Sequence, residues 1–221
     1  MAEWSRESIV ATLQRHRPAS NQGRLDLQGV DWRGLDLRGL NLNNLDLAEA
    51  NLASADLSQA TAVGTDFARA LLPIRIVGAD LAEADLYKSE GAAVDFTGSR
   101  LSGARLLRGN FFNAIFRRAD LSAAILTDGI FDGCDFSEAR LDRAEVSIGP
   151  SDCTVDGATA GDASGAVHPS ATVTVDGQPV SALEWFQAQS SRIEPSSGAL
   201  PEASSALLQQ WLDAYLRKRH P

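Results

Sequence analysis

The sequence is poor in the side chains that usually bind metals or act as nucleophiles. It contains two cysteines, Cys134 and Cys153, and three histidines, His16, His168 and His220, which stand far apart. Two cysteines are too few for the disulfide framework of a small secreted domain. A zinc site needs more Cys and His ligands at closer spacing. The sequence therefore predicts no metal and no cofactor.

Long hydrophobic runs and phosphate-binding loops are also missing. No run approaches the roughly 18 apolar residues of a membrane-spanning helix, and the first residues, MAEWSRESIVATLQRHRPAS, lack the apolar core of a signal peptide. The glycines occur at corners and in linkers, outside any phosphate-loop motif. None of the histidines lies beside a serine or cysteine nucleophile. These absences predict a soluble, cytoplasmic protein that is not an enzyme.

Positive charge is scarce as well. The formal net charge is -9, whereas direct nucleic-acid binding requires a basic surface. An acidic protein can still bind a partner that is itself basic. Hydrophobic residues make up 44% of the chain, enough to build a buried core.

What the sequence does have is an apolar residue at every fifth position. In LDLRGLNLNNLDLAEANLASADLSQA, residues 35–60, leucines recur at Leu37, Leu42, Leu47, Leu52 and Leu57. An α-helix turns about 100° per residue, so a period of five would spread these leucines around the helix. In a flat strand, an odd period would send successive leucines to opposite faces. Neither element explains the spacing.

The repeat has 10 + 15 = 25 centres, at 27–72 and 76–146 in steps of five. The residue two before each centre is apolar or small, including Ile74, so that each repeat reads inward, outward, inward. The polar or glycine pair that follows must turn a corner, and successive corners build a solenoid. The step from 72 to 76 lacks one residue, which predicts an irregular corner at Pro73. Gly91 replaces a large centre, and Phe111 is predicted to fill part of the hole.

These repeats, such as ANLAS, ADLSQ, ADLAE, VDFTG and CDFSE, resemble the pentapeptide-repeat family. The resemblance covers residues 25–148 and implies an all-β solenoid, a right-handed quadrilateral β-helix with four pentapeptides per coil. On that basis the 25 centres build about six coils.

The segments around the repeat predict a different structure. Residues 1–24 are expected to form an N-terminal helical cap with Ser5 as its N-cap. Residues 149–169, rich in Gly, Ser, Ala and Asp, are expected to form a linker or an irregular coil in which Cys153 could be exposed. In residues 170–221, the pair Asp176-Gly177 predicts a β-hairpin, followed by helices of which the first is capped by Ser181.

The last of these helices has an apolar stripe at i, i+3, i+4, i+7, i+8 spacing. The stripe comprises Leu208, Trp211, Leu212, Tyr215 and Leu216. We expect such a stripe to pack against another apolar surface, and two alternatives stay open. The helix either caps its own solenoid or forms a homodimer interface.

Four pentapeptides per coil predict that every fourth outward residue shares a side of the solenoid. Two acidic columns follow. One contains Asp26, Asp46, Asp66 and Asp85, and the other contains Asp36, Asp56, Asp95 and Asp135. Stacked like charges raise the local negative potential, so a narrow rod with such columns resembles the charge layout of duplex DNA.

Some members of the family confer resistance to quinolones or other gyrase poisons by mimicking DNA on type II topoisomerases, and many dimerise through the C-terminal region. The resemblance therefore implies a scaffold whose protein partner is DNA gyrase or topoisomerase IV. A predicted basic patch argues against mimicry; it comprises Arg100, Arg105, Arg108, Arg117 and Arg118. The alternative is an adaptor or immunity-type protein that recognises its partner through residues 170–221.

Overall fold

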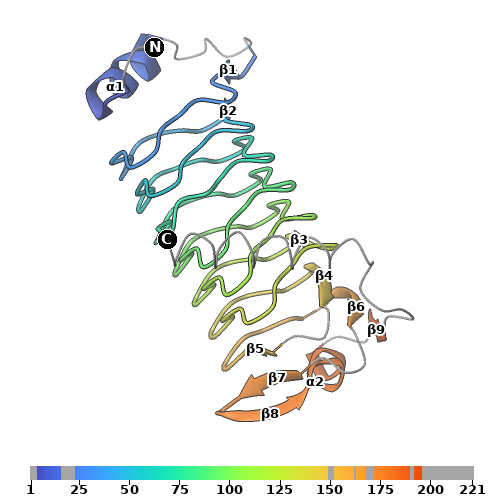
Figure 1. The fold of residues 1–221 in the computed structure, drawn as a ribbon. Coiled ribbons are helices and arrows are strands. Elements are labelled where there is room, and N and C mark those ends of the chain that lie inside the picture. Colours follow the sequence, from blue (N-terminus) through green and yellow to red (C-terminus); the bar gives the residue numbers. More distant parts are fainter. Residues whose placement is uncertain are drawn as a thin grey trace, which may run out of the picture.

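A computed structural model describes residues 4–15, 23–148, 152–161, 163–167, 172–189 and 192–195. Most of the chain winds into a rod of stacked coils (Figure 1). Helix α1 (Arg6–Arg15) lies at the N-terminal end of the rod, and β7 (Thr172–Val175), β8 (Gln178–Ser181) and α2 (Ala182–Gln189) lie at the other end.

Parallel ladders hold the coils together. Asp26 pairs with Asp46, and Asp46 pairs with Asp66, so a regular coil has 20 residues and four pentapeptides. One side of the rod carries most of the named strands, paired in parallel within two sheets. These strands are β1 (Leu25–Asp26), β2 (Leu45–Asp46), β3 (Ile125–Leu126), β4 (Glu145–Ile148), β6 (Ser164–Val167) and β9 (Arg192–Pro195). Between them, single bridges continue the same register.

Each corner, apart from the shortened one at Pro73, is a tight turn with one residue in the left-handed region. In the repeat that begins at Leu45, the amide of Ala50 donates to the carbonyl of Leu47, and Glu49 has a φ of 60°. The outward aspartate stabilises the turn, because Asp46 Oδ1 accepts a hydrogen bond of 3.1 Å from the amide of Ala48. Left-handed backbone favours glycine, yet most corners use another residue there.

The interior is filled by side chains at the predicted positions. The centres are buried, and the residues two before them are mostly alanine, serine or glycine. A Cβ atom added to Gly91 would lie 2.9 Å from the Phe111 ring and 3.2 Å from Leu72 Cδ1. The predicted filling by Phe111 is therefore confirmed, with Leu72 closing the other side.

The missing residue at Pro73 changes the corner in a way that the sequence reading did not anticipate. Leu71 and Arg75 lie on consecutive ladders only four residues apart, and Pro73 is buried between them. Ile74, predicted to point inward, is 60% exposed. With one residue fewer, Pro73 takes the inward place and Ile74 turns outward.

Helix α1 packs on the first coils. The Ser5 hydroxyl accepts a hydrogen bond of 3.2 Å from the amide of Ser8, as an N-cap does. Ile9 is buried, and the Trp4 and Trp32 rings meet edge to face at 5.7 Å. Among the described residues, no helix has the length and apolar character needed to cross a lipid bilayer.

Residues after 148 continue the ladders. Strand β5 (Asp152–Thr154) pairs in parallel with β7, which forms an antiparallel hairpin with β8 around Asp176 and Gly177. Cys153 is buried, with its Sγ donating to the carbonyl of Phe131 at 3.1 Å, so the expectation of an exposed cysteine is wrong. The hydroxyl of Ser181 accepts from the amide of Glu184 at the start of α2.

Candidate functional site

The outward ladder residues define four sides of the rod. Side 1 carries Asp26, Asp46, Asp66, Asp85, Arg105, Ile125 and Glu145. Side 2 carries Asp31, Asn51, Leu71, Glu90, Asn110 and Ile130. Side 3 carries Asp36, Asp56, Arg75, Asp95, Ile115 and Asp135. Side 4 carries Asn41, Thr61, Asp80, Arg100, Asp120 and Arg140. The two acidic columns therefore lie on sides 1 and 3, which are separated around the coil by sides 2 and 4.

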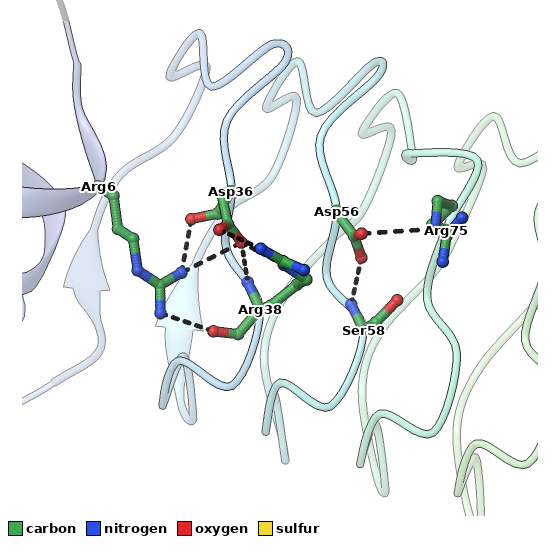
Figure 2. Close-up of polar contacts among 6 residues, drawn as sticks. All are labelled: Arg6, Asp36, Arg38, Asp56, Ser58 and Arg75. Atoms are coloured by element: carbon green, nitrogen blue, oxygen red, sulfur yellow. Dashed lines mark hydrogen bonds and ion pairs between the residues drawn. The ribbon is translucent and has the colours of Figure 1, made fainter.

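Arginines neutralise much of the side 3 column (Figure 2). Arg38 binds Asp36 with Nε and Nη2, both at 2.8 Å. Arg6 reaches from α1 and donates to the carbonyl of Asp36 at 2.7 Å and to that of Arg38 at 2.8 Å. One coil further, Arg75 Nε lies 3.4 Å from Asp56 Oδ2. The beginning of side 3 is thus also the point where α1 is attached to the rod.

These contacts shift the ionisation of the side 3 carboxylates. Hydrogen bonds from the Arg38 side chain and amide hold the pKa of Asp36 well below its usual value. Burial alone would raise the pKa of Asp56, but hydrogen bonds from Ser58 and the charge of Arg75 together lower it. Both carboxylates are therefore charged at neutral pH and largely compensated by arginine.

Arginines neutralise fewer of the carboxylates on side 1. Asp66 pairs with Arg24 at 3.1 Å, and Asp85 pairs with Arg105 at 2.7 Å. Within the described part of the chain, no ion pair reaches Asp26 or Asp46. The first coils of side 1 therefore carry the least neutralised pair of stacked aspartates in the two columns.

The outward aspartates have a structural role that is independent of their charge. Asn51 Oδ1 accepts a bond of 3.2 Å from the amide of Ala53, as Asp46 does from Ala48. Asn41 and Asn110 make the same bond to Asn43 and Phe112. Because asparagine makes the same corner bond as aspartate, the charge of a column can be removed while the turn is kept.

The expected basic patch is not a single surface. Arg105 lies on side 1 and Arg100 on side 4, while Arg117 and Arg118 follow side 3. Each is paired with an acid: Arg100 with Asp80, Arg105 with Asp85, Arg108 with Asp128, Arg117 with Asp135 and Arg118 with Glu138. The prediction of a patch is wrong because four repeats per coil distribute these arginines around the rod.

Sequence reasoning missed the arginines as partners of the acidic columns. Two sequence separations between an aspartate and an arginine indicate these ion pairs. An arginine two residues after an aspartate folds back on it, as Arg33 does on Asp31 and Arg38 on Asp36. An arginine one coil later reaches the aspartate below it, as Arg105 reaches Asp85.

Arg117 and Arg118 border a shallow groove of about 620 Å³ with Ser137, Glu138 and Asp156. The arginines are already paired, and the hydroxyl of Ser137 donates to Asp135. No group of three or more metal-ligating side chains occurs among residues that the structure describes. The predicted interface residues Leu208, Trp211, Leu212, Tyr215 and Leu216 lie outside the described residues.

Comparison with known proteins identifies the repeat. Eight copies match the family described as pentapeptide repeats, over residues 24–52, 75–117, 92–128 and 114–147. No curated protein matches the chain.

Among solved structures, the chain is similar to HetL, a pentapeptide repeat protein involved in heterocyst differentiation regulation in the cyanobacterium Nostoc. The two are 22% identical, with 79% of each chain covered and a TM-score of 0.54. Full-length QnrB1, a plasmid-mediated fluoroquinolone resistance protein, is 17% identical over 86% of this chain and 98% of its own, with a TM-score of 0.30. The likeness to HetL shows the fold, and the likeness to QnrB1 is too low to support an argument.

Proposed function

Because this chain belongs to the pentapeptide-repeat family, we propose that it is a non-enzymatic scaffold that binds another protein through the outer surface of its solenoid. The interior is packed with side chains, so chemically distinctive groups are on the outside. The proposed architecture is a right-handed quadrilateral β-helix of about six coils over 25–148. Residues 1–24 form its cap, and 149–169 form an irregular coil whose strand β6 continues the ladder of side 1. Residues 170–221 form an appendage, and the protein acts in the cytoplasm.

The proposed binding surface is side 1 of the first coils. The observation that carries it is the pair Asp26 and Asp46, stacked in register beside Asp66 and Asp85. Stacked carboxylates that few arginines neutralise concentrate negative potential along one line. A basic groove on a partner protein fits such a line.

The DNA-binding groove of a type II topoisomerase, DNA gyrase or topoisomerase IV, is the specific partner that we propose. Ladder neighbours lie about 4.8 Å apart, so side 1 places one carboxylate per step. Duplex DNA carries one charge per about 1.7 Å of its axis. From Asp26 to Asp85, side 1 therefore has at most roughly a third of the charge density of DNA, before the pairing of Asp66 and Asp85 with arginine is counted. Its binding should weaken steeply with salt.

A supercoiling assay with purified gyrase, with and without a quinolone, tests this proposal. The triple variant Asp26→Asn, Asp46→Asn, Asp66→Asn keeps the corner bonds and removes three charges from side 1. The matched control Asp80→Asn, Asp120→Asn, Asp142→Asn removes three charges from side 4 and the corner that follows it. We expect the side 1 variant to lose inhibition or protection and the control to retain it. Equal behaviour of both variants would exclude side 1, and a wild-type protein without any effect would exclude the topoisomerase.

The alternative function is an adaptor that recognises its partner through the C-terminal appendage. The β7–β8 hairpin favours it, since Pro179 and Val180 are exposed on an edge strand. Substituting Val180 with Asp would then abolish partner capture, whereas it leaves binding through side 1 unchanged.

A further inference from the structure

Side 2 is the least charged side of the solenoid. From Asn51 to Ile130 its ladder contains one ionisable residue, Glu90. Over the same coils, side 4 alternates acids and bases, from Asp80 and Arg100 onward. Because all four sides share one repeat backbone, the backbone does not require this difference.

The uncharged positions of side 2 expose large apolar groups. Leu71 is 43% exposed, and Ile74, in the shortened corner beside it, is 60% exposed. Phe112 and Ile130 are half-buried on the following coils. We name these four residues, with Ala92 between them, the apolar strip. From Leu71 to Ile130 it spans three ladder steps, or about 14 Å.

We propose that residues 205–219 of the same chain pack on the apolar strip as an amphipathic helix. Their stripe runs from Leu208 to Leu216, about 12 Å along a helix, which matches the length of the strip. The proposal commits to the chain itself as the occupant and is independent of the function proposed for side 1.

The chain can reach this surface. Strand β9 ends at Pro195 on the ladder of side 1, which adjoins side 2 around the coil. Along the rod, the coil that contains Leu71 lies six ladder steps from β9, a distance of about 29 Å. The 12 residues between Pro195 and Leu208 span up to about 40 Å when extended. A tether of this length keeps the segment at an effective concentration in the millimolar range, which favours it over a second molecule.

Charge is also complementary. Residues 196–221 contain three bases, Arg217, Lys218 and Arg219, and two acids, giving +1, so the rest of the chain carries -9 - 1 = -10. Glu90 lies within side 2, and its carboxylate accepts a bond of 3.1 Å from Asn110. Burial raises the pKa of Glu90 against the effect of that bond, so a nearby base would favour its charged form.

Hydrogen exchange measured by mass spectrometry on the full-length chain tests the proposal. In the wild-type protein, amides of residues 205–219 should be protected. The variant Leu71→Asn, Ile74→Asn alters two exposed side chains and should lower that protection at least about tenfold. The matched control Val63→Asn, Val77→Asn, on sides 4 and 3, should leave it unchanged.

A second variant keeps the test valid if the first disturbs the coils. Leu212→Asn lies in the segment itself and should remove its protection while the amides of the solenoid stay protected. An unprotected wild-type segment, or equal protection in the side 2 variant and its control, would overturn the proposal.

Light scattering at two protein concentrations distinguishes packing of the segment within its own chain from packing on a second copy. A monomer whose segment stays protected on tenfold dilution supports packing within the chain. A dimer whose protection falls with dilution would assign the stripe to a second copy and overturn the proposal.

Discussion

The solenoid has the same backbone before and after the corner at Pro73, but its core differs. Before the corner, most centres are leucine, with a single phenylalanine at Phe67. After it, five centres are phenylalanine: Phe96, Phe111, Phe116, Phe131 and Phe136. Their rings stack from coil to coil, with centroids 5.1 Å apart for Phe96 and Phe116, and 5.0 Å apart for Phe116 and Phe136.

Smaller neighbours compensate for two of the larger rings. Phe111 and Phe131 each follow a glycine by two residues, where the other repeats have alanine, serine or a larger residue. A Cβ atom added to Gly109 would lie 2.4 Å from the Phe111 ring, and one added to Gly129 would lie 2.7 Å from Phe131. At these two repeats, the methyl group that glycine lacks leaves the space that the phenylalanine ring occupies.

The residue types at the outward positions also change at the Pro73 corner. Before Pro73, nearly every outward position is Asp or Asn, which can accept the corner hydrogen bond. After it, several positions hold arginine or isoleucine, such as Arg105 and Ile125, whose side chains cannot. The second half therefore depends more on its core, and the first half more on its corners.

The largest effect should come from the middle of the phenylalanine stack. Phe116→Ala removes a ring packed between two others, and we expect it to lower the free energy of unfolding by about 3–5 kcal/mol. Leu57→Ala, on the same side before the corner, should cost less because no ring stacking is lost. Chemical denaturation measures both changes, and equal losses would show that stacking adds nothing to the second half.

Volume compensation gives the next effect. Gly109→Ala places a methyl group against the Phe111 ring and should cost about 1–3 kcal/mol. Adding Phe111→Leu should recover part of that loss, so that the double variant is more stable than the sum of the single changes predicts. Denaturation of the four proteins of this cycle provides the measurement. Strict additivity would mean that the two positions do not share one volume.

The sequence predicted this architecture to the level of the period. A five-residue spacing identified the inward and outward positions. The resemblance to the pentapeptide-repeat family, which implies four repeats per coil, predicted which aspartates share a ladder. Ile74 was misplaced because a missing residue can be absorbed in several ways, and the spacing does not say which side chain turns out. Cys153 was misplaced because glycine-rich composition hides a coil that continues the ladder.

The candidate site was predicted less well than the fold. Columns such as Asp36 and Asp56 follow from the register, but their neutralisation depends on where long arginine side chains reach. Arg6 approaches Asp36 from a helix 30 residues earlier, and nothing in the repeat indicates that contact. The surface charge of a repeat protein thus requires side-chain geometry even where the backbone follows from the spacing.

Removing a corner hydrogen bond should lower stability by a smaller amount. This loss should be larger in the first half of the solenoid than in the second. Asp46→Ala removes the acceptor for the Ala48 amide and should cost about 1 kcal/mol, whereas Asp46→Asn keeps it and should change stability by less than about 0.5 kcal/mol. Ile125→Asn introduces an acceptor at the equivalent position after the corner and should be nearly neutral, since lost apolar contact offsets the new bond. Thermal denaturation compares the three. Equal losses for Asp46→Ala and Asp46→Asn would mean that charge, and not the corner bond, stabilises the first half.

The smallest effect depends on pH and has opposite signs for two acids. Burial raises the pKa of Glu90, so the folded state holds a proton where the unfolded state has lost it, and stability falls as pH rises through this range. Glu90→Gln should therefore be more stable than the wild type at pH 7 and equal to it below about pH 4. Hydrogen bonds from Arg38 lower the pKa of Asp36, so its charged form favours folding, and Asp36→Asn should be less stable at pH 7 with the difference vanishing in acid. Denaturation across this pH range measures both, and shifts of the same sign would show that the exposed ion pairs around Asp36 contribute nothing to the first half.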